Sequence, residues 1–231
     1  MKSGEDKVSV NKRQFPKRLK AVLFDYDGVL VDSMYDNFRA WRKVFLKQKV
    51  SLRKNDYLPL EGMNPAGVAR TIVLNNKLKL SESQILKIAR DKDNVYVNFN
   101  KLRLYPGVLQ ILKRLKASKK LLALVSGATK LRLAKTAPGK LLALFDVLIT
   151  GDMNLKVKPS PDPYKRALEM LEVESHEAVA VENAPLGILS VSGAGLYCIA
   201  IRSTLPAKFL SNADLIIEKF FDLKKYLLQG K

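Results

Sequence analysis

The sequence predicts an α/β fold, a doubly wound parallel sheet that carries an inserted all-helical domain. Three observations support this prediction. Short apolar runs rich in strand-forming residues recur along the 231-residue chain, and helical patterns lie between most of them. One connection, of about 95 residues after the first run, has helical periodicity and no comparable strand. A structureless loop of that length would be improbable in a compact protein, which favours an insertion.

Six apolar runs are the predicted strands. Each is nearly continuous in apolar character, as expected for strands of a parallel sheet that are buried on both faces. They cover residues 21–25, 121–125, 146–150, 178–182, 197–201 and 214–218. Helices are predicted between them, for example over 108–116 and 163–171. Alternating strands and helices predict a doubly wound core.

The helical insertion defines the predicted domains. Its helical patterns cover 35–49, 65–77 and 82–99. We therefore expect a Rossmann-like catalytic core made of 19–33 and 103–231, and a helical cap domain over 34–102. Residues 1–18 are charged and lack apolar periodicity, so a flexible basic extension is expected there.

Composition narrows the possible functions. The chain has 41 Lys and Arg against 22 Asp and Glu, a net charge of +19. Nucleic acid must be considered as a partner for such a chain, but the basic residues are scattered and form no recognised nucleic-acid motif, so this partner is unlikely. No apolar run approaches the ~18 residues of a membrane-spanning helix, and no signal-like stretch opens the chain, which predicts a cytoplasmic protein with no membrane partner.

The chain has one cysteine and one histidine, which excludes an intramolecular disulfide and several kinds of metal site. Cys198 is the only cysteine, so an intramolecular disulfide and a cysteine-based metal site are impossible. It lies in an apolar run and is expected to be a buried thiol. His176 is the only histidine, which excludes polyhistidine metal sites and leaves it in a polar stretch without a triad.

Polar residues follow three of the predicted strands. Asp25, Asp27 and Gly28 follow the first, Ser126-Gly127 the second, and Glu182-Asn183 the fourth. Ligands of open parallel sheets bind beyond the carboxyl ends of the strands, so these side chains are expected at one edge. Asp25 and Asp27 are two residues apart and can share a site, where a hard divalent cation would relieve their repulsion. We therefore expect Mg²⁺ as the cofactor.

Four segments, in order, resemble the signatures of the haloacid dehalogenase superfamily. They are LFDYDGVLVDS (23–33), LVSGAT (124–129), VKPSPDPY (157–164) and VENAPLGILSVSGAG (181–195). NFRAW (37–41) and LYPGV (104–108) further resemble its β-phosphoglucomutase-like phosphatases with a helical cap. The resemblance covers nearly the whole chain from Lys20 onward.

This resemblance implies a role for each site residue. Asp25 would attack phosphorus and form an aspartyl phosphate, while Asp27 would act as general acid and then base. Ser126, through its hydroxyl, Gly127, through its backbone N–H, and Lys158 would bind the transferred phosphoryl group. Mg²⁺ would be bound by Asp25, Asp27, Glu182 and Asn183.

Three departures from the family pattern bear on function. Asn183 stands where a second acid is common, which predicts weaker metal binding. Asn37 stands where the mutases have a hinge histidine. Pro65 stands where they have a phosphate-binding arginine; Arg70 is the nearest arginine. Arg70 and Lys77 are expected to be exposed helix charges.

These departures favour hydrolysis over a mutase reaction. We expect a monomeric phosphatase, a phosphoric monoester hydrolase that acts on small phosphorylated, sugar-phosphate-like metabolites. A β-phosphoglucomutase-type phosphotransferase and a non-catalytic basic binding protein on the same scaffold remain the alternatives.

Overall fold

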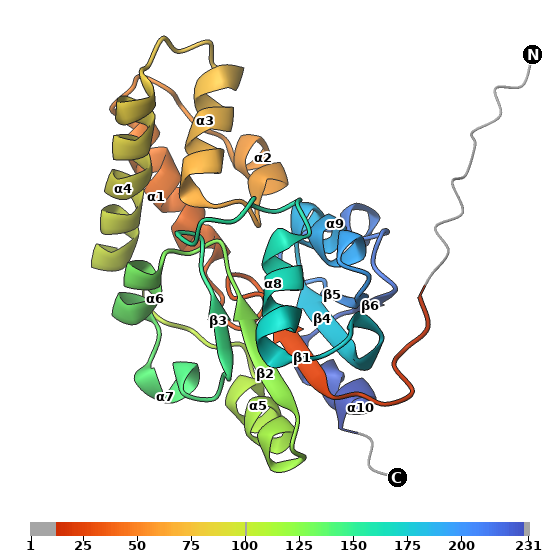
Figure 1. The fold of residues 1–231 in the computed structure, drawn as a ribbon. Helices are drawn as coiled ribbons and strands as arrows, with labels where there is room; N and C mark the ends of the chain where they lie inside the picture. Colours follow the sequence, from red (N-terminus) through yellow and green to blue (C-terminus); the bar gives the residue numbers. More distant parts are fainter. Residues whose placement is uncertain (1–12, 100, 229–231) are drawn as a thin grey trace, which may run out of the picture.

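The computed structural model of the protein describes residues 13–99 and 101–228, and its centre is a six-stranded parallel sheet. The strand order is β3-β2-β1-β4-β5-β6 (Figure 1). The strands are β1 Ala21–Phe24, β2 Leu121–Val125, β3 Val147–Ile149, β4 Ala178–Glu182, β5 Tyr197–Ile201 and β6 Leu215–Ile217. All six predicted strands are confirmed, each to within one residue at either end.

Helices cover both faces of the sheet because strand side chains alternate between them. Val22 and Phe24 of β1 belong to one hydrophobic cluster, and Ala21 and Leu23 belong to the other. The first cluster includes residues of α5 Val108–Ala117, α6 Lys130–Thr136, α7 Gly139–Leu142, η4 Phe220–Leu223 and α10 Lys224–Leu227. The second includes residues of α8 Asp162–Leu171 and α9 Pro185–Gly193. The predicted doubly wound α/β class is confirmed. Two short 3-10 helices, η2 Ser175–Glu177 and η3 Ala207–Phe209, complete this part.

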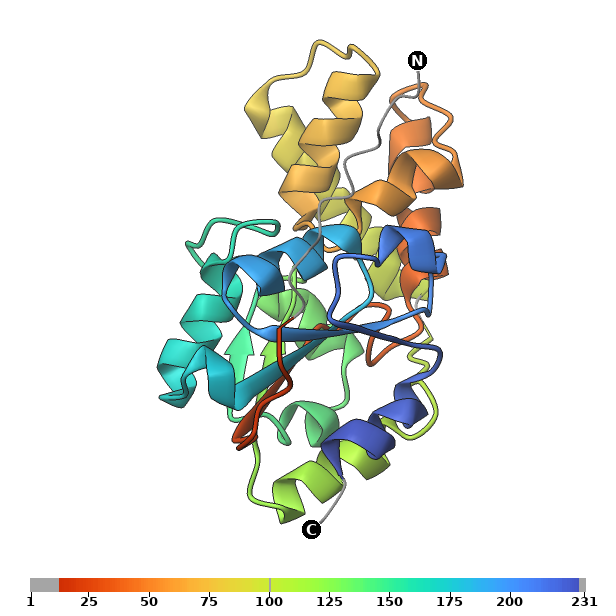
Figure 2. The same cartoon turned by 90° about the vertical axis from the view of Figure 1, so that its right-hand side faces the viewer.

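A helical layer stands at one end of the sheet (Figures 1 and 2). It consists of α1 Met34–Leu46, α2 Lys54–Tyr57, the 3-10 helix η1 Leu58–Leu60, α3 Pro65–Asn75 and α4 Glu82–Phe99. Trp41, Phe45, Tyr57 and Ile72 are buried in a third hydrophobic cluster, which is formed by this layer alone. The three predicted helices are present, whereas α2 and η1 were not predicted. We call these five elements the cap helices; the predicted domain boundaries at 34 and 102 stay a prediction.

Two chain segments connect the cap helices to the sheet, and they pair with each other. Val31 and Leu104 form an antiparallel bridge. The Asp32 N–H donates to the Arg103 carbonyl at 2.8 Å, and the Tyr105 N–H donates to the Leu30 carbonyl at 3.0 Å. The exit and return of the chain are therefore tied together at one place.

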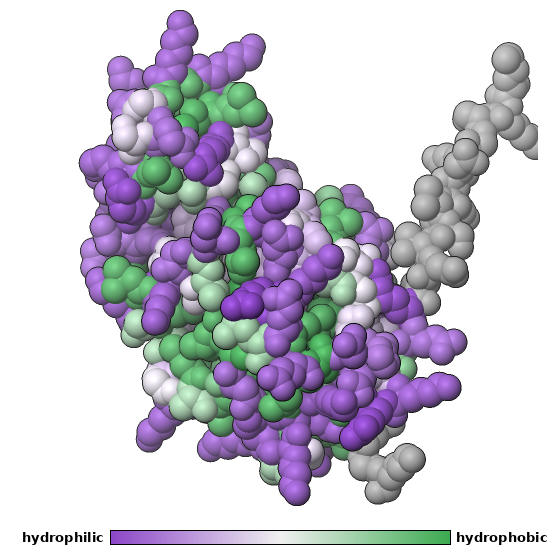
Figure 3. Space-filling model, viewed as in Figure 1, coloured by the Kyte–Doolittle hydropathy of each residue, from purple (hydrophilic) through white to green (hydrophobic). Residues whose placement is uncertain are grey.

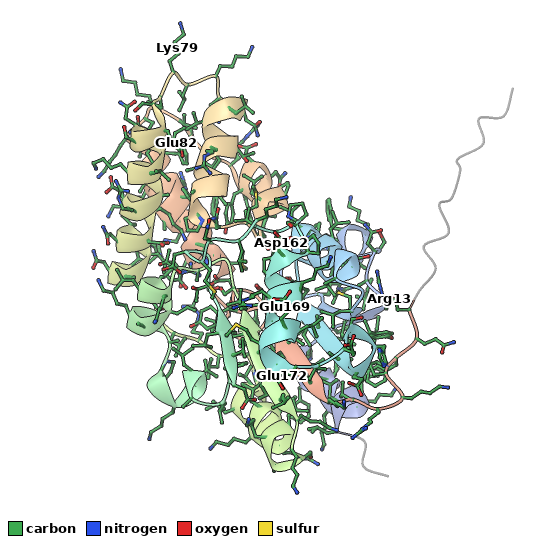
Figure 4. All side chains as sticks on the ribbon, viewed as in Figure 1. Arg13, Lys79, Glu82, Asp162, Glu169 and Glu172 are labelled. Atoms are coloured by element: carbon green, nitrogen blue, oxygen red, sulfur yellow. The ribbon has the colours of Figure 1, made fainter. Side chains whose placement is uncertain are left out.

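The segment before β1 packs against the core from residue 13 onward. The backbone N–H of Arg13, which is labelled in Figure 4, donates to Asp214 Oδ1 at 2.7 Å. The Arg13 guanidinium forms an ion pair with the same carboxylate at 3.2 Å. The Phe15 ring meets the Tyr197 ring edge-on, with centroids 5.3 Å apart. An ion pair and an aromatic contact thus connect Arg13 and Phe15 to the core, while the predicted flexible extension over 1–18 stays a prediction. Residues 1–12 lie outside the described residues.

Hydrophilic side chains cover most of the face that Figure 3 shows.

Cys198 is completely buried in β5, as expected, and burial raises the pKa of its thiol well above the ordinary value. Within the described part of the chain, no helix has both the length and the apolar character needed to cross a membrane.

Candidate active site

Asp25 and Lys158 form a buried ion pair at the carboxyl end of β1. Lys158 Nζ lies 2.7 Å from Asp25 Oδ1 and 2.7 Å from Glu182 Oε1, and it also donates to the Val125 carbonyl at 3.1 Å. The side chains of Lys158, Asp25 and Glu182 are 3%, 6% and 0% exposed. One ammonium group thus joins the ends of β1, β2 and β4, as the convergence of their carboxyl ends predicts.

The charges of this trio set its protonation. Burial raises the pKa of Asp25 to about 7; the Glu182 charge acts in the same direction, and the Lys158 charge opposes it. Burial alone would lower the pKa of Lys158, but Asp25 and Glu182 raise it above its ordinary value. Lys158 is therefore a permanent cation beside Asp25, and it favours the ionised carboxylate that a nucleophile requires.

Asp27 faces a different set of partners. Its Oδ1 accepts from the Ser33 hydroxyl at 2.5 Å and from Asn37 Nδ2 at 3.2 Å, while Oδ2 is paired with the Arg132 guanidinium. Burial alone would raise the pKa of Asp27, but Arg132, Ser33 and Lys92 together hold it below the ordinary value. In this arrangement Asp27 is a stable carboxylate.

Two buried cations meet at Asn37. Lys92 Nζ lies 2.6 Å from Asn37 Oδ1, and Arg132 Nη1 donates to the same oxygen at 2.9 Å. Burial first, and then the Arg132 charge, lower the pKa of Lys92 to about 8. Lys92 comes from α4 of the cap helices and Arg132 from α6 of the core, so this network joins the two layers.

Sequence reasoning missed Lys92 and Arg132. Both stand in helical segments rich in exposed charge, DKDN and KLRLAK, and no spacing signal separates them from their neighbours. The sequence analysis had matched Asn37, the residue that both cations contact, to the hinge histidine of the mutases. That match gave no indication of which residues surround Asn37.

Ser126 and Gly127 lie where the cap helices approach the sheet. Ser126 Oγ accepts from the Ala128 N–H at 3.0 Å, as in a local turn. A Cβ at Gly127 would lie 2.9 Å from the Met63 carbonyl oxygen, so glycine allows the cap segment to come close. Both residues, together with Lys158, line one pocket.

A second, adjoining pocket contains the two aspartates. Its wall includes Asp25, Asp27, Gly127 and Arg132 from the core, and Trp41 and Lys92 from the cap helices. Gly127 lines both pockets. The structure therefore brings Asp25, Asp27, Ser126, Gly127 and Lys158 to one end of the sheet beneath the cap helices.

The predicted metal ligands differ in the oxygens they have free. The Glu182 carboxylate accepts from Lys158, from Tyr164 Oη at 2.7 Å and from the Asn183 N–H at 3.1 Å. Asn183 Oδ1 is buried and has no hydrogen-bond partner among the residues that the structure describes. An unsatisfied buried carbonyl oxygen suits a hard cation, and Asn183 follows β4, the strand that pairs with β1 before Asp25.

Asp25 and Asn183 therefore fit Mg²⁺ as ligands. Asp25 accepts one hydrogen bond from Lys158, whereas the carboxylates of Asp27 and Glu182 each accept three. Across residues 13–99 and 101–228, no group of three or more His, Cys, Asp or Glu side chains is arranged to hold a metal ion. The four-residue ligand set stays a prediction.

Glu61 is a buried acid that the sequence analysis did not identify. It lies between η1 and α3 and is 2% exposed. Its Oε2 accepts from Thr204 Oγ1 at 3.1 Å. Burial raises the pKa of Glu61 to about 8, against the effect of the Thr204 hydrogen bond. A lone Glu in the turn EGMN has no sequence signal that predicts burial.

Arg70 and Pro65 occupy different surroundings. Arg70 pairs with Glu82, and both side chains are about half exposed. Glu82 lies in the outer part of the cap helices, far from the sheet (Figure 4). Arg70 is thus an exposed helix charge, as expected, while Pro65 lines the pocket of the two aspartates.

Comparisons with known proteins found one matching family model and several relatives. The family model described as haloacid dehalogenase-like hydrolase matches residues 22–201. Validoxylamine A 7'-phosphate phosphatase of Streptomyces hygroscopicus subsp. limoneus is 27% identical, over 89% of this chain and 96% of its own length. Beta-phosphoglucomutase of Bacillus subtilis is also 27% identical, over 91% and 94%.

One relative is much longer than this chain. Protein SUPPRESSOR OF QUENCHING 1, chloroplastic, of Arabidopsis thaliana is 28% identical over 85% of this chain, which spans only 19% of that protein. Among solved structures, CbbY of Rhodobacter sphaeroides in complex with phosphate has 27% identity and a TM-score of 0.77, covering 89% of this chain and 96% of that one.

Proposed function

Because the chain belongs to the haloacid dehalogenase-like hydrolases, we propose that it is a Mg²⁺-dependent phosphoric monoester hydrolase acting on small phosphorylated metabolites. The observation that carries the proposal is the contact between Lys158 Nζ and Asp25 Oδ1, at 2.7 Å, at the carboxyl end of β1. A carboxylate oxygen and a fixed positive charge thus lie together on the sheet edge that binds ligands in this fold class, which supports the proposed nucleophilic role of Asp25.

The first proposed step is the attack of Asp25 on phosphorus. A carboxylate oxygen of Asp25 forms a bond to phosphorus while the bond from phosphorus to the substrate oxygen breaks. The departing oxygen takes a proton from Asp27. Lys158 stabilises the charge that spreads over the phosphoryl oxygens, and the Ser126 hydroxyl and Gly127 N–H orient them.

The second step releases phosphate. Water attacks phosphorus, Asp27 takes up one proton from that water, and the bond between phosphorus and Asp25 breaks. Asp25 returns as a carboxylate and Asp27 as an acid, so the cycle balances.

This role of Asp27 requires a change in its partners. An aspartate paired with a guanidinium gives up and takes up protons poorly near neutral pH, because the positive charge stabilises its ionised form. Asp27 must therefore leave Arg132 before it can protonate the departing oxygen.

Mg²⁺ fits the same edge. Asp25 would bind it together with Asn183 Oδ1, which has no hydrogen-bond partner in the part of the chain that the structure describes, and Asp27 and Glu182 are the further predicted ligands. When bound, Mg²⁺ supplies positive charge against the phosphoryl oxygens. Asn183 is neutral and contributes less attraction than an aspartate would.

Two relatives bear on the substrate. The Streptomyces protein is named a validoxylamine A 7'-phosphate phosphatase and the Bacillus protein a beta-phosphoglucomutase, which supports a sugar-phosphate-like substrate here. Hydrolysis is favoured because Arg70 lies away from the pocket and pairs with Glu82. The monomeric state and the cytoplasmic location stay predictions.

The test measures phosphate release from sugar phosphates, nucleotides and an aryl phosphate, with Mg²⁺ or with a chelator. The wild type is compared with Asp25→Asn and with the control Asp91→Asn, an exposed acid paired with Lys87. We expect metal-dependent release that Asp25→Asn abolishes and Asp91→Asn retains. Isomerised hexose phosphate without release would indicate a mutase. Neither reaction, with all proteins folded, would refute the proposal in favour of a non-catalytic binding protein.

A further inference from the structure

We propose that Glu61, in the cap helices, is a positioning residue that turns the Asn183 oxygen toward the cation through Thr204. The inference rests on the metal site of the proposed function and concerns how this chain orients a neutral ligand. It follows from the direction of two hydrogen bonds, and from the buried Asn183 Oδ1, which has no hydrogen-bond partner among the residues that the structure describes.

The two hydrogen bonds run in series. Asn183 Nδ2 donates to Thr204 Oγ1 at 3.1 Å, and Thr204 Oγ1 donates to Glu61 Oε2 at 3.1 Å. A threonine hydroxyl has one hydrogen, and here the Glu61 oxygen accepts it. Thr204 can then only accept from Asn183. The amide must therefore turn its nitrogen toward Thr204 and its oxygen to the opposite side.

The surroundings hold the amide in that orientation. Asn183 is 1% exposed, and Glu61 is 2% exposed. A Cβ at Gly28 would lie 2.1 Å from Asn183 Nδ2, so the turn after β1 packs directly onto the amide nitrogen. Asn183 Oδ1 is left buried without a partner in the described part of the chain. A cation at the Asp25 edge would satisfy it.

An aspartate in place of Asn183 would need no such arrangement. Both oxygens of a carboxylate can bind a cation, so either rotation of the side chain presents a ligand. An amide presents its oxygen in one rotation only, and the other turns two N–H donors toward the cation. Thr204 and Glu61 therefore matter because residue 183 is an asparagine.

The first test measures metal binding directly, without substrate. Binding of Mn²⁺ by electron paramagnetic resonance and of Mg²⁺ by calorimetry is compared for the wild type, Thr204→Val and the matched control Thr204→Ser. Outer partners of metal ligands change affinity by ~10–100-fold. We expect Thr204→Val and Glu61→Leu to weaken binding at least about tenfold, and Thr204→Ser to stay within about twofold of the wild type.

The second test repeats Thr204→Val in an Asn183→Asp background. We expect it to have at most about a twofold effect there, because a carboxylate needs no orientation. Equal weakening in both backgrounds would mean that Thr204 acts only through packing, and would overturn the inference.

Thermal melts check that all variants are folded. If the wild type binds the metal and Thr204→Val binds it equally well, this inference fails while the proposed function stands. If the wild type binds neither ion, the proposed metal site fails, and the inference fails with it.

Discussion

Arg132 holds the carboxylate of Asp27 in an ion pair that is mostly withdrawn from water. The Arg132 side chain is 3% exposed and that of Asp27 is 20% exposed. The residue proposed to carry protons is therefore kept ionised by a residue from a different part of the chain. Two properties of the protein depend on this pair, its stability and the pH dependence of its reaction.

Arg132→Gln should change both properties. Loss of the guanidinium leaves Asp27 partly buried without its cation, which should lower the free energy of unfolding by about 3 kcal/mol at neutral pH. The paired state lowers the pKa of Asp27, so its stabilising contribution is present above the ordinary aspartate pKa and is lost as pH falls. The difference in free energy of unfolding between the variant and the wild type should therefore become smaller at acid pH. Urea denaturation at several pH values measures it.

The same substitution should move the alkaline limb of kcat/KM to higher pH by about one unit, because Asp27 acts first as an acid and an opposite charge lowers a carboxyl pKa by ~1–3 units. Arg70→Gln is the control: its ion pair with Glu82 is half exposed, so the substitution should leave the free energy of unfolding nearly unchanged. Unchanged pH profiles for Arg132→Gln would show that Asp27 does not set this limb.

Lys158→Met should abolish turnover and destabilise the fold. It leaves the buried Asp25 and Glu182 carboxylates without their shared cation, which should cost about 3–5 kcal/mol. Calorimetry measures this loss of unfolding free energy. The control is Lys116→Met, which breaks an ion pair with Asp146 that is about one-third exposed and should lower the unfolding free energy by ~1 kcal/mol or less. In an Asp25→Asn background the cost of Lys158→Met should fall, since one of the two charges is gone. An undiminished cost would show that Asp25 is not coupled to Lys158.

Glu61→Gln should remove a pH dependence of stability in the metal-free protein. The pKa of Glu61 is raised from 4.5 to about 8, so the folded state binds more protons than the unfolded state between these values. Stability from this group is then complete below pH 4.5 and falls as pH rises toward 8, by up to a few kcal/mol at about 1.4 kcal/mol per unit. Chemical denaturation with a chelator should show a smaller decline for the variant. Parallel curves would exclude a raised pKa at Glu61.

Gly28→Ala should disturb the turn after β1. Gly28 has φ +81°, and an added Cβ would lie 2.1 Å from Asn183 Nδ2. Strain and collision together should cost about 2 kcal/mol or more. Gly139→Ala is the matched control, because nothing lies within 4 Å of its added Cβ and the residue is in helix α7. It should be neutral or stabilising by up to ~1 kcal/mol in thermal melts. Similar effects for the two variants would contradict the close packing at Gly28.

The strands and the position of the site could be predicted because both depend on local patterns. Continuous apolar runs predict buried parallel strands, and polar residues at their ends predict a common edge. Asp25 and Lys158 are 133 residues apart, yet each stands in a segment that resembles a family signature. Their contact at 2.7 Å agrees with that prediction.

Arg132, Lys92 and Glu61 could not be predicted because burial of a charge is decided by tertiary packing. Arg132 stands among exposed cations on α6. Its pairing with Asp27 and Asn37 offsets the free-energy cost of removing its guanidinium from water. Glu61 is buried because the turn between η1 and α3 meets Thr204 of the core. Neither contact has a periodic or spaced signal in the sequence.

The bridge between Val31 and Leu104 constrains how the cap helices could move. Since the outgoing and returning segments are hydrogen-bonded to each other, rotation about this pair would carry the whole helical layer as one body. That rotation would take Glu61 away from Thr204 and Asn37 away from Asp27 and Arg132 together. A single swing about one axis would thus take Asn37 from Asp27 and Glu61 from the hydroxyl that orients the cation ligand at the same moment, while Asp27 and Arg132, which both belong to the core, would stay paired.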